Sequence, residues 1–126
     1  MSAAKPPAPE PLRRLSPEEL ARLRDHTVSH YEQNAEDFAL ATADHDVSQN
    51  VEALLRHIEA RAPYEILDLG CGPGRDLVTF VERGHHPVGL DAAPSFVRMA
   101  REHSGCEVWE QDLLALDLPP QRFDGV

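Results

Sequence analysis

The sequence predicts an α/β fold: a parallel sheet with helices on both faces, preceded by N-terminal helices. Three observations support it. An apolar run leads into closely spaced glycines over residues 66–74, a second apolar run ends in Asp91, and the segments between such runs have helical periodicity. Strands that alternate with helices form right-handed crossovers, so successive strands run parallel. We expect three strands and the start of a fourth, where the sheet is truncated.

The composition of the 126 residues is that of one small globular domain, with 41% hydrophobic and 27% charged residues. No apolar run approaches the roughly 18 residues of a membrane span, so we expect no membrane association. The two cysteines, Cys71 and Cys106, favour a reducing cytoplasm, with a single disulfide as the alternative. The net charge of −10 disfavours nucleic acid as a partner without excluding it.

The N-terminal part divides into two segments. Residues 1–15 are proline-rich and predict a disordered or extended leader. A helical segment over residues 16–62 follows. Ser16 is the expected helix N-cap, Pro17 suits the first turn, and Glu19 completes a capping box with Ser16.

Two helices are expected within that segment. The first has an interruption within residues 29–34. The second begins at Asp46 or Ser48, reaches about Arg61 and is ended by Pro63. Its apolar residues recur with the helical period and form one stripe: Val51, Leu54, Leu55 and Ile58.

Residues 63–126 form the predicted core of the fold. Its elements alternate in type, with Gly84 and Gly105 as helix stops and Pro94 as a helix start. The expected strands are 64–69, 87–91 and 106–111, the expected helices are 76–82 and 94–105, and a fourth strand starts at 123–126.

The loop after the first strand carries glycines at alternate positions, Gly70, Gly72 and Gly74. Glycine lets the backbone turn tightly and approach a ligand, and the following helix points its unpaired N–H groups at the same place. Asp91 ends the next strand, at the position from which a carboxylate can accept hydrogen bonds from two ribose hydroxyls. Together these residues predict a nucleoside-binding crevice.

Two ligands compete for that crevice. A dinucleotide fingerprint has the spacing Gly-x-Gly-x-x-Gly, but Arg75 stands where its third glycine would be. Asp68, just before the glycines, also suits a ligand with cationic groups and no pyrophosphate. S-adenosylmethionine, with its sulfonium and ammonium groups, is such a ligand.

Residues 67–74 (Leu-Asp-Leu-Gly-Cys-Gly-Pro-Gly) resemble motif I of the class I S-adenosylmethionine-dependent methyltransferases, which have a Rossmann-like fold. Residues 88–92, 109–113 and 123–126 resemble the family's next motifs in order, and residues 31–38 resemble the N-terminal helix that covers the cofactor in many small-molecule methyltransferases. The resemblance implies these S-adenosylmethionine-binding residues: Tyr31, Asp68, Gly70, Gly72, Gly74, Arg75, Asp91, Ala92, Asp112 and Leu113.

Each acid of the implied site has a competing role. Asp68 is expected near the methionine ammonium, and capping of the glycine loop is the alternative. Asp91 is expected to hold the ribose, and N-capping of the helix at Pro94 is the alternative. By the resemblance Asp112 takes the adenine amino group while Leu113 lines the base pocket, although an acid after a strand is common in any loop.

The remaining candidates are weighed in the same way. For Arg75, contact with the cofactor carboxylate and a solvated position at the helix start stand side by side. Packing of the Tyr31 ring against the domain is favoured over coverage of the methionine end. Cys71 is expected to be a small loop residue without thiol chemistry. The histidines show no metal-ligand spacing, so we expect no metal site and no functional histidine.

The favoured function is an S-adenosylmethionine-dependent methyltransferase that acts on a small molecule. Family members carry about seven strands, so the acceptor side is expected to lie outside this chain, and no catalytic residue is assigned. The exposed edge of a truncated sheet predicts self-association or a partner chain. A non-catalytic binding module and an NAD-dependent oxidoreductase are the alternatives.

Overall fold

The structure, a computed structural model, describes residues 4–9 and 13–126. Residues 1–3 and 10–12, which belong to the predicted leader, lie outside the described residues; residues 4–9 are exposed and have no helix or strand. The elements occur in this order: α1 (Pro17–Gln33), α2 (Ala35–Thr42), α3 (Ser48–Arg56), β1 (Glu65–Leu69), α4 (Arg75–Glu82), β2 (His86–Asp91), α5 (Pro94–Ser104) and β3 (Val108–Glu110). No helix in this described part is long and apolar enough to cross a membrane.

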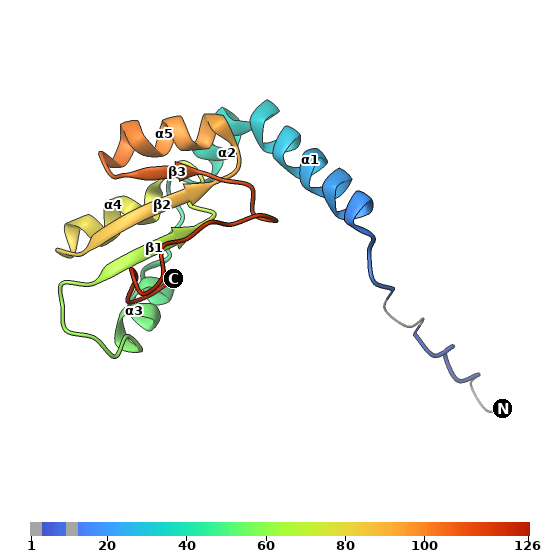
Figure 1. Cartoon of the computed structure of the whole chain (residues 1–126), viewed down its shortest axis with the longest axis horizontal. Coiled ribbons are helices and arrows are strands. Elements are labelled where there is room, and N and C mark those ends of the chain that lie inside the picture. Colours follow the sequence, from blue (N-terminus) through green and yellow to red (C-terminus); the bar gives the residue numbers. More distant parts are fainter. Residues whose placement is uncertain (1–3, 10–12) are drawn as a thin grey trace.

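The strands form a parallel sheet in the order β1-β2-β3 (Figure 1). The register pairs Leu67 with Val88 and Gly89 with Val108. On the other edge of β1, Ile66 bridges to Gly125 in parallel, and the Leu67 amide donates to the Gly125 carbonyl over 2.9 Å. The α/β fold class with a parallel sheet is therefore confirmed, and the segment near Gly125 lies where a fourth strand was expected to start.

One face of the sheet is covered by α3, α4 and α5. Ile66 of β1 packs with Val51 of α3 and Phe80 of α4. The crossovers from β1 to β2 and from β2 to β3 progress in the same direction, so their helices lie on the same face. On the opposite face, within the described residues, Leu118 and Phe123 of the loop after β3 pack against the strands, beside Trp109 of β3 itself.

The predicted capping box starts α1. The Ser16 hydroxyl accepts from the Glu19 amide over 3.1 Å, and the Glu19 carboxylate accepts from the Ser16 amide over 2.8 Å. The helix then continues without interruption to Gln33, so the expected break within residues 29–34 is confined to Asn34. There the backbone leaves the helical region, and the Asn34 side chain donates to the His30 carbonyl over 2.8 Å.

The helix expected to reach about Arg61 is shorter, because α3 ends at Arg56. The His57 amide donates to the Leu54 carbonyl over 3.1 Å, which tightens the last turn. The chain then leaves the helix, and Ile58 still packs against the buried cluster that contains Val51 and Ile66. The third strand is also shorter than expected, because a turn at Ser104 and Cys106 precedes it.

Candidate functional site

The glycine-rich loop joins β1 to α4 at the carboxyl edge of the sheet. Gly70, Gly72 and Gly74 have φ angles of +74°, +54° and +92°, a region that other L-residues rarely adopt. A Cβ atom on Gly74 would lie 2.8 Å from the Ala100 Cα atom, so glycine lets the loop pack directly on α5. The Gly70 amide donates to the Leu90 carbonyl over 2.7 Å, which fixes the loop to β2.

Asp91, at the end of β2, lies directly opposite this loop. Its carboxylate accepts from the Gly72 amide over 2.9 Å and from the Ala93 amide over 3.0 Å. Asp91 is not the N-cap of α5, because Ala93 occupies that position without a side-chain cap. The acid and the glycines expected to lie together are therefore joined by a hydrogen bond.

Asp68 is the unusual acid of the site. Its Oδ2 atom is buried and has no hydrogen-bond partner among the described residues. Burial raises the pKa of Asp68 from 3.8 to about 6, the Asp76 and Asp91 carboxylates add to the rise, and Arg75 opposes it. The alternative in which Asp68 caps the glycine loop is not realised, because the Gly72 amide donates to Asp91 instead.

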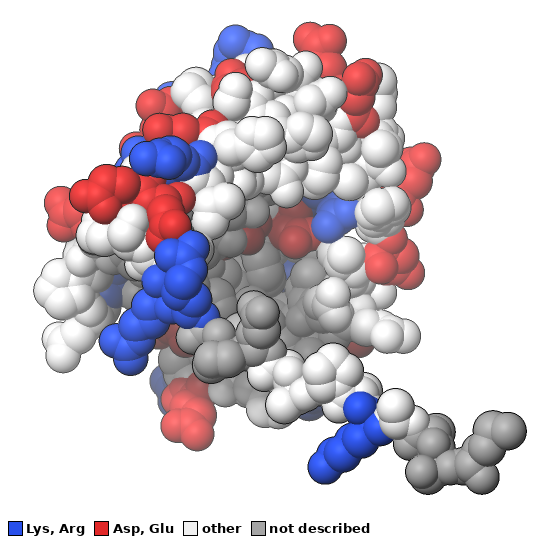
Figure 2. Space-filling model, turned by 90° about the vertical axis from the view of Figure 1, so that its right-hand side faces the viewer, with Lys and Arg blue, Asp and Glu red and all other residues white. Residues whose placement is uncertain are grey.

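A cavity of about 470 Å³ opens between the loop, the ends of β1 and β2, and the N-terminal helices. Figure 2 views the molecule from the side to which the strands' carboxyl ends point, and this face is hollowed with acidic side chains in and around the hollow. Eight of the ten predicted residues line this cavity: Tyr31, Asp68, Gly70, Gly72, Arg75, Asp91, Ala92 and Leu113. Gly74 packs on α5 instead, and Asp112 lines a neighbouring cavity.

An aromatic cluster forms the cover of the cavity. The ring centroid of Tyr31 lies 5.4 Å from that of Phe38 and 5.5 Å from that of Phe96, so α1, α2 and α5 meet here. The favoured packing role of Tyr31 agrees with this arrangement, and its ring also lines the cavity. Edge-to-face and tilted aromatic pairs of this kind fix the relative positions of the elements that carry them.

The Arg75 guanidinium joins the start of α4 to the end of α2 through hydrogen bonds. Its Nη1 atom donates to the Thr42 carbonyl over 2.9 Å and its Nε atom to Asp76 over 3.2 Å. The His45 amide donates to the same Thr42 carbonyl over 3.1 Å, so the end of α2 is bound to the start of α4. Arg75 thereby holds the covering segment in place while it lines the cavity.

Several lining residues were missed by the sequence analysis. They are Thr27, Val28, Phe38, Thr42, His45, Pro73, Asp76, Ala93 and Phe96, together with Cys71. His45 follows α2 in a turn without any periodic or spacing signal, so only the fold brings it here. Phe96 stands in the first turn of α5, next to Asp91 in space, and that position is the signal that could have identified it.

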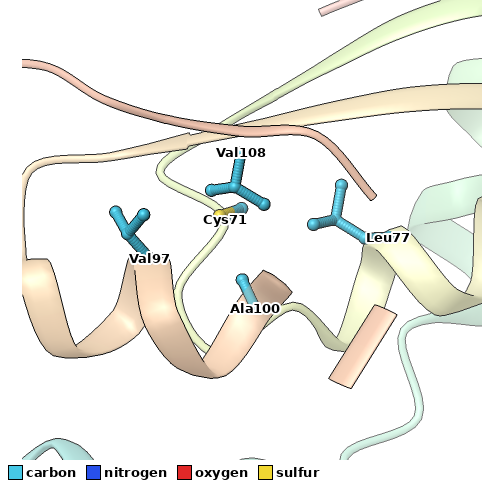
Figure 3. Packing of buried hydrophobic residues seen from close by; sticks show 5 residues of the cluster. All are labelled: Cys71, Leu77, Val97, Ala100 and Val108. Carbon is cyan, nitrogen blue, oxygen red and sulfur yellow. The ribbon is translucent and has the colours of Figure 1, made fainter. Parts of the chain in front are cut away.

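Cys71 packs behind the loop among apolar side chains of α4, α5 and β3, as Figure 3 shows. Burial raises the pKa of the Cys71 thiol to about 12, and Asp68 and Asp91 contribute to the rise. The thiol is therefore protonated at neutral pH, as expected for a packing residue. Within residues 4–9 and 13–126, no three His, Cys, Asp or Glu side chains gather as a metal site would need.

Asp112 follows β3 and faces α1. Its Oδ2 atom accepts from Nη1 of Arg24 over 2.6 Å, and its Oδ1 atom accepts from the Leu114 amide over 2.9 Å. The resulting turn places Leu113 at the main cavity, while Asp112 itself lines an adjacent cavity of about 370 Å³.

The arrangement suits a nucleoside with a cationic group. The buried Oδ2 atom of Asp68 has no hydrogen-bond partner among the described residues, and the Asp91 carboxylate retains lone pairs beyond its two hydrogen bonds. The crevice lies at the carboxyl ends of parallel strands, where open α/β sheets bind ligands. The fold and the site are those of α/β proteins that bind a nucleoside cofactor.

Comparison with known proteins narrows this class. Residues 66–126 match the family described as "Methyltransferase domain". The chain is 41% identical over 76 residues to trans-aconitate 2-methyltransferase of Rhodococcus jostii, covering 59% of this chain and 29% of that protein. It is 37% identical over 81 residues to the 18S rRNA (guanine-N(7))-methyltransferase bud23 of Schizosaccharomyces pombe, covering 60% of this chain and 29% of that protein.

A solved structure agrees with these sequences. The 1,6-didemethyltoxoflavin-N1-methyltransferase of Burkholderia thailandensis, with bound 1,6-didemethyltoxoflavin and S-adenosylhomocysteine, is 27% identical with a TM-score of 0.55, covering 87% of this chain and 48% of that chain. Residues 66–126 therefore match the methyltransferase-domain family, and this part of the chain is similar to a class I S-adenosylmethionine-dependent methyltransferase domain over part of its length. The chain spans between 24% and 37% of the length of the curated relatives it matches.

Proposed function

We propose that this chain binds S-adenosylmethionine in the main cavity and forms the cofactor half of a methyltransferase that acts on a small molecule. The observation that carries the proposal is the buried, unpartnered Asp68 oxygen beside the loop that Asp91 holds in place. A cationic amine is the ligand group that satisfies such an oxygen.

Each end of the cofactor has matching residues in this proposal. Asp68 takes the ammonium group, and Asp91 takes the ribose hydroxyls with the lone pairs that its two amide contacts leave. Ala92 and Leu113 flank the adenine, and Asp112 accepts from its amino group. The aromatic ring of Tyr31 closes the methionine end, where Arg75 faces the cofactor carboxylate.

Bound S-adenosylmethionine supplies a methyl group that its sulfonium already activates for in-line displacement. The residues of this chain hold the cofactor and, through the aromatic cover of Tyr31, Phe38 and Phe96, keep water from it. No residue is assigned as a general base, because such a base is needed only when the acceptor must lose a proton.

A small-molecule acceptor is favoured over RNA by charge. Two of the relatives act on small molecules and bud23 acts on rRNA by their names. With 22 acidic residues against 12 Lys and Arg, this chain repels a phosphate backbone unless another part of the protein supplies cations. A cytoplasmic location is proposed with it, since both cysteines are free.

Calorimetric titration tests the proposal. We expect the purified chain to bind S-adenosylmethionine and S-adenosylhomocysteine saturably and NAD not at all, because Asp68 at the loop opposes a pyrophosphate. Asp91→Ala is expected to abolish binding. Asp117→Ala is the matched control, because it also removes an aspartate carboxylate, from an exposed loop residue that does not line the main cavity. This variant should bind the cofactor as the unmodified chain does. Binding of NAD alone would contradict the methyltransferase proposal and favour the oxidoreductase alternative.

Catalysis and self-association need separate measurements. Transfer of a labelled methyl group to small carboxylic acids or heterocycles distinguishes an enzyme from a non-catalytic binding module. For the β1 edge, where Leu69 is 43% exposed, we propose self-association or a partner chain. Light scattering that finds only monomer over a wide range of concentration would contradict self-association.

A further inference from the structure

Arg24 of α1 lies far from the sheet in sequence but meets the loop that follows β3. Its Nη1 atom is 2.6 Å from Oδ2 of Asp112, and its Nε atom is 2.9 Å from the Asp25 carboxylate. The Arg24 and Asp112 side chains are 31% and 35% exposed, so the pair is partly shielded from water. Because Asp25 and Asp112 both pair with the Arg24 guanidinium, the position of the guanidinium beside Asp112 is fixed.

Arg24 and Asp112 line the adjacent cavity of about 370 Å³, which is continuous with the main cavity through shared lining residues. Val28 and Ala92 line both cavities, and Ala92 follows Asp91 directly. In the proposed binding mode, the ribose lies at Asp91 and the base extends through the shared lining toward the end of the neighbouring strand, β3. The Gln111 amide donates to the Asp91 carbonyl over 3.2 Å, which brings that strand end against Asp91. The base therefore reaches the cavity that Arg24 and Asp112 line.

Asp112 keeps acceptor capacity for a ligand. A carboxylate has about four lone-pair sites, and Arg24 and the Leu114 amide engage one on each oxygen. The two contacts come from different elements and together fix where the carboxylate lies. An amino group at the base can use a remaining lone pair without displacing either contact.

We propose that Arg24 is a positioning residue for recognition of the adenine amino group: its ion pair holds the Asp112 carboxylate in place for that group. This inference rests on the proposed function, since it requires the cofactor to bind with its adenine at Asp112. Arg24 acts through Asp112 and does not itself contact the reacting atoms. Nucleoside recognition then also depends on a residue of α1, a helix that lies outside the sequence motifs of the sheet.

The test compares S-adenosylhomocysteine with its deaminated form, S-inosylhomocysteine, in which an oxo group replaces the amine and the neighbouring ring nitrogen N1 carries a proton. The unmodified chain is expected to prefer the adenosyl ligand by about tenfold or more, the value of a hydrogen bond to a charged acceptor. Arg24→Gln should bring this ratio close to one, and Arg24→Lys should restore part of it.

Arg22→Gln is the matched control, because Arg22 is exposed on the same helix and the chemical change is identical. Its ratio should equal that of the unmodified chain. A ratio unchanged in Arg24→Gln, or adenosyl binding that becomes tighter, would overturn the inference. If circular dichroism shows that Arg24→Gln does not fold, the ratio of adenosyl to inosyl affinity is measured for Arg24→Lys instead. A ratio for Arg24→Lys equal to that of the unmodified chain would then overturn the inference. No binding of either ligand by the unmodified chain would instead overturn the proposed function, and the inference with it.

Discussion

The Oδ2 atom of Asp91 accepts a hydrogen bond from the Gly72 amide over 2.9 Å, which joins the end of β2 to the middle of the glycine-rich loop. The same carboxylate holds the Ala93 amide at the start of α5. One side chain therefore connects a strand end, a loop and a helix start around the main cavity. The stability of the fold and the shape of the site depend on the same residue.

Removal of this carboxylate should destabilise the chain. In Asp91→Ala the Gly72 and Ala93 amides lose a charged acceptor, so we expect the free energy of unfolding to fall by about 1–3 kcal/mol. Urea denaturation at pH 5, where Asp68 holds its proton and repulsion between the two acids is absent, is the appropriate measurement. Asp117→Ala should leave the midpoint unchanged. Equal midpoints for the two variants would show that the Asp91 contacts contribute nothing.

Asp68 should make stability depend on pH. Its folded-state pKa is about 6 against an ordinary 3.8, so between these values the folded chain holds a proton that the unfolded chain has released. The free energy of unfolding therefore decreases as the pH rises from about 4 to 6, and the loss persists above pH 6. We expect Asp68→Asn to unfold at higher urea than the unmodified chain at pH 8, by roughly 1–3 kcal/mol. The two should be similar near pH 4.

The same carboxyl should have the opposite effect on ligand binding. A cationic amine favours ionised Asp68, so the affinity for S-adenosylhomocysteine is expected to rise as the pH increases through 6. Calorimetry at pH 5 and 7 measures this rise. Asp68→Asn should bind weakly at both values; a pH dependence that survives in this variant would assign the effect to another group.

Gly74→Ala should be more destabilising than Gly84→Ala. Both glycines have positive φ angles, +92° and +83°, so alanine costs about 1 kcal/mol at either position. Only at Gly74 does the new Cβ atom meet backbone, at 2.8 Å from the Ala100 Cα atom, and overpacking adds about 1–3 kcal/mol. Urea midpoints measure the difference. Equal losses would mean that the loop can move away from α5 without cost.

Glu32 should control how firmly α1 is attached. Its carboxylate accepts from the Ser95 amide over 2.6 Å and from the Ser95 hydroxyl over 2.8 Å, at the N-terminus of α5. Glu32→Gln loses the charge that favours this position, so α1 amides should exchange with solvent faster while α4 amides do not. Glu102→Gln, at an exposed position of α5, is the control. Faster exchange throughout the chain would indicate general destabilisation rather than release of α1.

The parts of the fold that could be predicted from the sequence are those with local signals. Ser16 and Glu19 formed the predicted capping box because both partners lie within one turn. The glycines and Asp91 came together because a βαβ unit has one handedness and brings successive strand ends to one edge. The end of α3 was misjudged because the apolar stripe continues to Ile58, which packs on the same buried cluster as Val51 although it lies beyond the last helical residue.

The site residues that escaped prediction depend on contacts between segments far apart in sequence. Thr42 and His45 line the cavity where Arg75 donates to the Thr42 carbonyl, a contact between α4 and the end of α2 that no spacing encodes. Asp112 was assigned from its motif alone, and no sequence pattern indicates that Arg24 pairs with it. That the Asp68 Oδ2 atom has no partner is likewise not visible in the sequence, because the Gly72 amide donates to Asp91 of the next strand.

Binding of the cofactor in the crevice between the glycine-rich loop and Asp91 can be followed on individual amides. The experiment is a titration of the ¹⁵N-labelled chain with S-adenosylhomocysteine, recorded by amide NMR. We expect the Gly70, Gly72 and Ala93 amide signals to shift, while those of Gly84 and Gly105, which precede β2 and β3 at the opposite edge of the sheet, do not. Shifts confined to the opposite edge, or none at saturating ligand, would contradict binding in this crevice.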